Sequence, residues 1–86
     1  MNDLEKEKRT LPAKWAQYLF GKGETGMGYQ IVDIILDDDT VVKDVAVIES
    51  NYIGQIRGYA GPMPPFDVNR IKDIRMTHNK WNFRAE

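Results

Sequence analysis

The chain has 86 residues, with 12 Lys and Arg against 13 Asp and Glu and no cysteine. This length allows one small domain, and these counts exclude a disulfide-rich toxin, a large enzyme and a strongly basic nucleic-acid binder. No apolar run is long enough for a membrane span or a secretory signal, so we expect a cytoplasmic protein without a membrane partner.

The first nine residues, MNDLEKEKR, are charged and nearly free of apolar side chains. Such a segment buries too little apolar surface to order itself. We therefore predict a flexible tail over residues 1–9 and a single domain over residues 10–86.

A short helix is predicted from Thr10 to Gly21. Pro12 is tolerated in a first helical turn, and Gly21 ends the pattern. The apolar side chains recur at i, i+4, i+7 and i+8, which places them on one face: Leu11, Trp15, Tyr18 and Leu19. A helix this short is unstable alone, so we expect this face to dock on the core.

Four segments rich in β-branched residues predict strands: 29–36, 41–49, 52–59 and 71–78. The turn at residues 37–40 is short enough for an antiparallel hairpin. Gly54 and Gly58 predict a bend in the third strand. Asp67 is expected to cap one helical turn over residues 68–70.

These elements predict an α+β, mainly β fold, with an N-terminal helix before a strongly bent, four- or five-stranded antiparallel meander. This order resembles that of the SH3-like and Sm-like small barrels over residues 11–78, and the resemblance implies a small barrel. Sm proteins bind RNA through an Asp and an Asn in the turn after their second strand. Here that turn reads Glu49-Ser50-Asn51. Since it departs from the Sm pattern, the RNA site is not carried over.

Charge is uneven along the chain. Residues 33–49 contain six acids and one base, whereas residues 51–86 contain six bases and three acids. Strands from the two segments could pair and neutralise each other, or the asymmetry could mark a polar binding surface.

Three motifs invite a catalytic or ligand-binding interpretation. Residues 21–26 spell G-x-G-x-x-G, but a predicted helix precedes them and a strand follows, the reverse of a phosphate-binding loop. A hinge is the simpler prediction, with a loop that orders on a partner as the alternative. Residues 37–39 are three adjacent aspartates without the alternate spacing of a calcium loop, so a solvated turn is predicted.

The third is His78, the one histidine, which has no second histidine or cysteine to complete a metal site. We expect an ordinary strand-end side chain, and an enzyme that uses it with an acid is the weakest hypothesis. The sequence therefore predicts no catalytic residue, no metal and no cofactor.

Aromatic and arginine side chains are interleaved in the C-terminal half. The candidate partner-binding residues are Tyr52, Arg57, Tyr59, Phe66, Arg75 and Trp81. On a regular third strand Arg57 and Tyr59 would share one face, while Ile56 would point to the core. Such a set is typical of protein interfaces and of single-stranded nucleic-acid sites, although the aromatics could equally cap the core while the arginines pair with the aspartates.

From these observations we expect a small non-catalytic protein-binding module, of an accessory or inhibitor type. It would bind a protein partner, or a second copy in a homo-oligomer, through the aromatic and arginine surface and through exposed sheet edges. The alternative is a small barrel that binds single-stranded nucleic acid.

Overall fold

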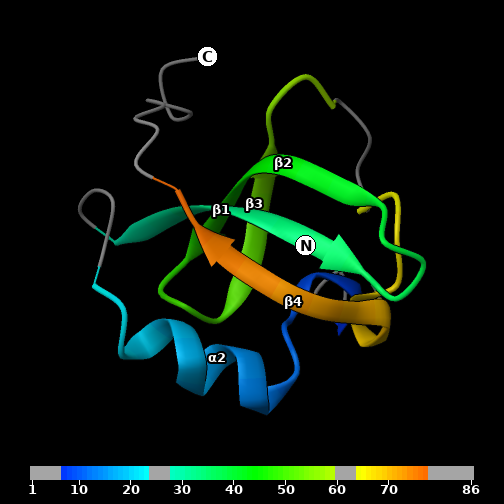
Figure 1. Ribbon diagram of the computed structural model, residues 1–86. Helices are drawn as coiled ribbons and strands as arrows, with labels where there is room; N and C mark the ends of the chain where they lie inside the picture. Colours follow the sequence, from blue (N-terminus) through cyan, green and yellow to red (C-terminus); the bar gives the residue numbers. More distant parts are fainter. Residues whose placement is uncertain (1–6, 24–27, 60–63, 78–86) are drawn as a thin grey trace.

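The computed structural model describes residues 7–23, 28–59 and 64–77 of the chain. Its elements in chain order are α2 (Ala13–Phe20), β1 (Tyr29–Leu36), β2 (Val41–Ile48), β3 (Tyr52–Ile56), the 3₁₀ turn η1 (Val68–Arg70) and β4 (Ile71–Met76) (Figure 1). Residues 7–9 are also helical. The fold is therefore small and mainly β, with one short helix beside the sheet, and the predicted order of elements is confirmed.

The four strands form one antiparallel sheet in the order β3-β2-β1-β4. The first three strands follow one another as a meander, as predicted, but β4 pairs with β1 and not with β3. The meander prediction is therefore wrong for the last strand. Strand β1 is apolar on both faces, and a partner on each side satisfies its backbone groups. No pairing joins β3 to β4 in the described part of the chain, so the sheet is not closed.

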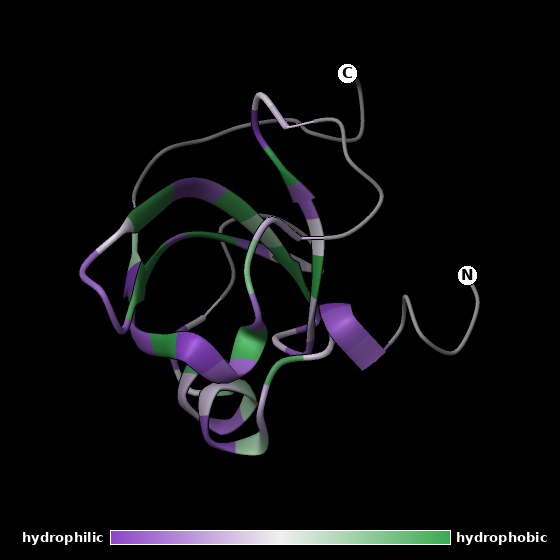
Figure 2. Ribbon diagram, turned by 90° about the vertical axis from the view of Figure 1, so that its right-hand side faces the viewer, coloured by the Kyte–Doolittle hydropathy of each residue, from purple (hydrophilic) through white to green (hydrophobic). Residues whose placement is uncertain are grey.

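Most of the core lies on one face of the sheet, where α2 covers it. Two of the four predicted helical core residues, Leu11 and Leu19, are buried there, and Trp15 packs against the same cluster. Tyr18 is 39% exposed, so its prediction as a core residue is wrong. A smaller cluster around Ile31 and Ala46 occupies the other face. Figure 2 shows apolar stretches along the strands, interrupted by polar residues, and further polar residues in the turns and helical segments.

Strand β3 is shorter and more irregular than predicted. Its pairing with β2 shifts register between Ala46 and Val47, and Ile53 and Ile56 are both buried although they differ by an odd number of positions. After Ile56 the chain turns back, since the amide of Tyr59 donates to the carbonyl of Ile56 at 3.1 Å. The predicted continuation to Tyr59, with Arg57 and Tyr59 on one strand face, is therefore wrong. Gly58, with φ +80°, makes this turn possible.

Gly54 lies where β3 and the side chain of a residue on β2 approach each other closely. A Cβ atom at this position would lie 2.7 Å from Cγ1 of Ile48 on the neighbouring strand. That distance is shorter than any ordinary contact, so the side chain of Ile48 occupies the space that the missing Cβ leaves.

We predict that Gly54→Ala destabilises the fold by about 1–3 kcal/mol, because the new methyl group overpacks against Ile48. Chemical denaturation measures the change. In the Ile48→Ala background the same substitution should be much less harmful. Gly21→Ala is the matched control, since that glycine has φ −81° and its Cβ would meet nothing closer than 3.7 Å. Equal effects at the two glycines would contradict the prediction.

Candidate partner-binding surface

The described candidate residues are spread over the molecule. Tyr52, Arg57 and Tyr59 lie in or directly after β3, whereas Arg75 lies on β4, which is the opposite edge strand. Phe66 packs against the core and lines a pocket of about 350 Å³ that also includes residues 7, 8, 64 and 67–69. Trp81, like His78, lies outside the described residues. An interface built from this set as a whole stays a prediction.

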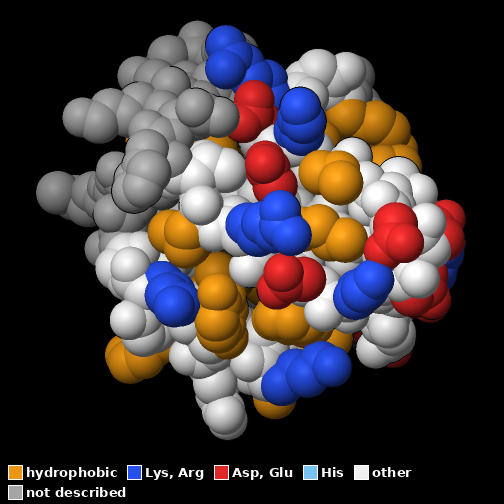
Figure 3. Space-filling view, in the orientation of Figure 1, with side chains coloured by type: hydrophobic (Ala, Val, Ile, Leu, Met, Phe, Trp, Pro, Cys, Tyr) orange, Lys and Arg blue, Asp and Glu red, His pale blue; other side chains and the backbone are white. Residues whose placement is uncertain are grey.

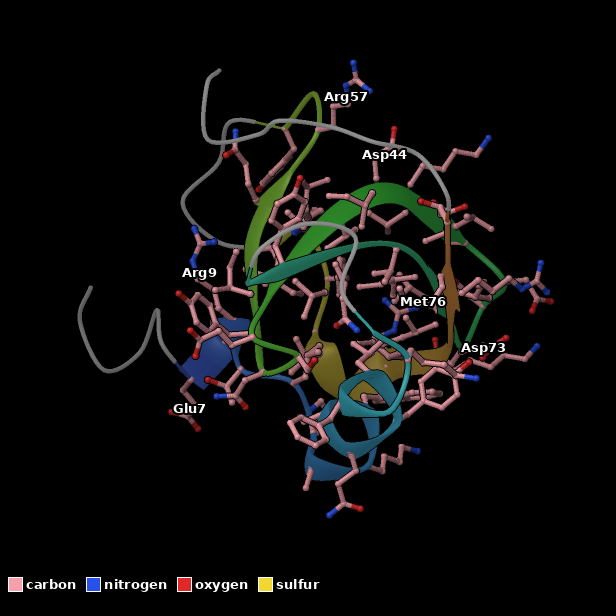
Figure 4. The ribbon with its side chains drawn as sticks, turned by 90° about the vertical axis from the view of Figure 1, so that its left-hand side faces the viewer. Glu7, Arg9, Asp44, Arg57, Asp73 and Met76 are labelled. Atoms are coloured by element: carbon pink, nitrogen blue, oxygen red, sulfur yellow. The ribbon has the colours of Figure 1, made fainter. Side chains whose placement is uncertain are left out.

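Arg57 and Tyr59 lie at a turn that Asp44 holds. The backbone amide of Arg57 donates to the carbonyl of Asp44 at 3.1 Å, and Nη1 of Arg57 lies 3.9 Å from Oδ2 of Asp44. Asp44 has φ +54°, and its amide donates to the carboxylate of Asp33 at 3.2 Å. Figure 4 shows the Arg57 and Asp44 side chains together at one end of the molecule, away from Asp73. The charge of Arg57 is thus partly compensated by Asp44.

The aspartates of the β1–β2 turn pair with Arg70, directly before β4, and with Lys72 on β4. Arg70 contacts Asp37 at 2.9 Å and Asp38 at 3.2 Å, and Lys72 lies 2.6 Å from Asp39. These contacts agree with the predicted solvated turn and with neutralisation between the acidic and basic segments. All are exposed, so each stabilises the fold only slightly.

Hydrogen bonds around this turn shift the protonation of its charged groups. Bonds from Thr40 hold the pKa of Asp38 below its usual value, with Arg70 adding to the effect. Contact with Asp37 raises the pKa of Arg70, and contact with Asp39 raises that of Lys72. The turn therefore keeps its charged form over a wider pH range than isolated side chains would.

Basic side chains do not form a continuous track in the described part of the chain. Arg75 lies 3.7 Å from Asp73 on the same strand, and Arg57, Arg70 and Lys72 also have carboxylates within 4.0 Å. Figure 3 shows the same pattern on one face of the molecule, where blue and red side chains alternate. This arrangement gives little support to binding of a phosphate backbone.

The outer edge of β3 is covered by the segment that precedes α2. Nη1 of Arg9 donates to the carbonyls of Ile53 and Gly54 at 3.2 and 3.1 Å, and Thr10 forms an antiparallel bridge with Tyr52. The tail prediction included residues 7–9, yet these are helical and Arg9 is anchored to the sheet. The edge of β3 is thus unavailable as an open docking row at these positions.

Strand β4 is protected against pairing with a further strand by one of its own side chains. The carboxylate of Asp73 accepts a hydrogen bond from the amide of Ile74 at 2.9 Å. The register pairs Asp73 with Ile35 and Ile74 with Ile34, and in an antiparallel ladder successive residues direct their backbone groups to opposite sides. The amide of Ile74 therefore points away from β1, toward the open edge of the sheet. At that edge the carboxylate of Asp73 competes for this amide with any strand that would be added.

A second pocket lies where the end of α2, the start of β1 and the β2–β3 turn meet. It has a volume of about 460 Å³, and we call it the Phe20 pocket. Its described lining residues are Phe20, Gly23, Gly28, Gln30, Glu49 and Ser50. None of them is among the predicted partner-binding residues, although Gly23 belongs to the 21–26 loop whose alternative role was to order on a partner.

Gln30 holds the three segments of this pocket together. Its side-chain Nε2 donates to the carbonyls of Leu19 and Gly23 at 2.7 and 2.9 Å, and its Oε1 accepts from the hydroxyl of Ser50 at 3.0 Å. Only 1% of Gln30 is exposed. Both donors and the acceptor are satisfied, which fixes the orientation of the amide. The one signal in the sequence is a glutamine inside the apolar strand YQIVDIIL.

The β2–β3 turn beside Gln30 has an unusual backbone. Glu49 and Ser50 have φ +52° and +59°, and the amide of Asn51 donates to the carbonyl of Ile48 at 3.0 Å. Such a type I′ turn favours Asn-Gly, because larger residues lose about 1–2 kcal/mol each in left-handed backbone. The amide of Glu49 also donates to the carbonyl of Gly28 at 2.9 Å, which helps to hold this strained conformation. Strained residues often cluster at functional sites.

The rim of the Phe20 pocket carries an exposed aromatic side chain and a carboxylate without a basic partner among the described residues. Phe20 is 84% exposed, the highest value among the large apolar side chains that the structure describes. Glu49 is exposed as well, and its carboxylate contacts no base among the described residues. Tyr18 is nearby in the sequence, and the ammonium of Lys22 lies 4.8 Å from its ring centre.

Comparison of the chain with protein-family models, with curated proteins and with solved structures finds no match. In the described part of the chain, no helix is long and apolar enough to cross a membrane, and no three potential metal ligands cluster together. The account of the site therefore depends on the geometry of this chain.

We predict that Gln30→Leu destabilises the fold by about 2–4 kcal/mol, because two buried carbonyls and one hydroxyl lose their partner. Gln17→Leu on the exposed face of α2 is the control, and it should change the free energy of unfolding by at most about 0.5 kcal/mol. Denaturant unfolding measures both. A Gln30→Leu variant as stable as the unchanged protein would show that the network is not needed.

A pH effect is expected at the β1–β2 turn. The folded state lowers the pKa of Asp38 below its usual 3.8. The ionised carboxylate therefore stabilises the fold fully above pH 3.8, and this stabilisation is lost as the pH falls through the lowered pKa. Between pH 5 and pH 2 the melting temperature should therefore fall less in Asp38→Asn than in the unchanged protein. If NMR titration finds that Asp38 protonates at or above pH 3.8, this explanation fails.

Proposed function

We propose that this chain is a small, non-catalytic protein-binding module that docks a protein partner at the Phe20 pocket. The observation that supports the proposal is the 84% exposure of Phe20 at the rim of a pocket with polar walls. A phenylalanine in this position is placed to become buried when a partner binds, and exposed aromatics with polar surroundings are frequent anchors at interfaces.

Binding fits the pocket better than catalysis. Glu49 is its one titratable lining residue among those described, and the hydroxyl of Ser50 is donated to Gln30 and not to a base. A nucleophile needs an adjacent base and a further group to orient it. Its described lining residues offer a contact surface but no such combination.

The proposal keeps the expected class of function but assigns the main contact with the partner to the Phe20 pocket. Arg57 and Tyr59 were expected to anchor the partner, and Tyr59 is 38% exposed, so the turn after β3 can serve as a secondary contact. An accessory or inhibitor role, a cytoplasmic location and self-association belong to the same proposal. The 3₁₀ turn directly before β4 supports a relationship to SH3-like barrels as part of it.

Nucleic-acid binding is the less favoured alternative, because carboxylates accompany the described bases between residues 57 and 77. It would require a salt-sensitive surface with a clear excess of positive charge.

Photo-cross-linking tests the proposed surface directly. With p-benzoyl-phenylalanine in place of Phe20, irradiation in cells of the source organism should yield a discrete protein adduct. The matched control carries the same group in place of Val41, an exposed apolar residue on β2, and should yield no such adduct. If the adduct contains a second copy of the chain, the partner is that copy and the protein forms a homo-oligomer. Identical adduct patterns from both positions, or none from position 20, would contradict the proposal.

A further inference from the structure

We propose that the Phe20 pocket receives an arginine side chain of the partner, an inference that rests on the proposed function of this surface. The charge, the exposed ring and the remaining polar groups of the pocket each contribute to it.

The pocket has an electronegative lining. Glu49 is its one charged residue among the described lining residues, and its carboxylate has no basic partner among them. Helix α2 ends at Phe20, and the carbonyl end of a helix favours positive charge. A cationic group would therefore be attracted, whereas a carboxylate or phosphate would meet Glu49, and no lysine or arginine among the described lining residues would compensate the repulsion.

The ring of Phe20 favours arginine among the cationic side chains. A phenyl ring attracts a cation through its face, and a planar guanidinium can also stack on it. The same guanidinium presents two parallel N–H groups to a carboxylate such as that of Glu49. A lysine ammonium would form a point contact with each group but could not stack.

The polar groups inside the pocket favour a ligand that donates hydrogen bonds over one that accepts them. Both Nε2 donors of Gln30 are used by the carbonyls of Leu19 and Gly23, so they cannot bind an anion. The hydroxyl of Ser50 donates to Gln30, and its free lone pairs can accept a further hydrogen bond. Together with Glu49, it presents acceptors to a ligand that brings donors. The volume of about 460 Å³ lies within the usual range for small ligand groups.

The strained turn explains why the carboxylate lies at this position. The left-handed backbone of Glu49 and Ser50 is maintained by the bonds to Gly28 and Gln30, which belong to the same pocket. A glycine in either place would relieve the strain but would remove the carboxylate or the hydroxyl. The sequence thus has polar side chains at two positions where the backbone favours glycine.

NMR titration of the isotope-labelled chain with N-acetyl-arginine amide tests the inference. Amide signals of Gly23, Gly28, Glu49 and Ser50 should shift in a saturable way, with a dissociation constant on the order of millimolar. N-acetyl-citrulline amide, which has nearly the same shape but no charge, should bind the chain at least about fivefold more weakly than the arginine compound.

Variants separate the contributions of the two rim residues. Glu49→Gln and Phe20→Leu should each weaken arginine binding at least about fivefold, whereas Glu7→Gln, which changes a carboxylate at the other pocket, should leave it unchanged. Melting temperatures confirm that each variant is folded. Equal binding of arginine and citrulline, or full binding by Glu49→Gln, would overturn the inference. A specific cross-link at position 20 without arginine binding would also overturn it, while the proposed docking surface would stand.

Discussion

The buried amide of Gln30 is the interaction on which the Phe20 pocket depends. It lies at the start of the central pair of strands and bonds to the end of α2, to Gly23 and to the β2–β3 turn. A polar group buried without partners would cost the fold stability, so its three bonds are mutually required. The same bonds determine where Phe20 and Glu49 lie, which connects the packing of the core to the shape of the surface.

Elsewhere on the described surface, polar contacts restrain the sheet and occupy groups that a partner could otherwise bind. Arg9 covers carbonyls of β3, and Asp73 binds an amide on β4. Arg70 and Lys72 hold the acidic turn between β1 and β2. Because these groups already have partners, they are less available to a partner than the exposed ring of Phe20 and the carboxylate of Glu49, which pairs with no base among the described residues.

Local patterns predicted most of the fold. The bounds of β1 and the cap at Asp67 were predicted correctly, since apolar runs and turn residues determine them locally. The pairing of β4 with β1 was missed, because strand order depends on which edge of the sheet most needs a partner. The end of β3 was missed because a register shift disrupts the alternation on which the prediction relied. The candidate site was not recognised in the sequence, because Gln30, Glu49 and Phe20 share no motif and only folding brings them to one pocket.

Hydrogen exchange of the Gln30 side-chain amide tests the central claim most directly. The account predicts that its two Nε2 protons exchange with solvent far more slowly than those of Gln17, which is exposed on α2 in the same molecule, because both are donated to buried or partly buried carbonyls. Exchange of the Gln30 protons as fast as those of Gln17 would contradict it, since the amide would then not join the helix, the loop and the turn.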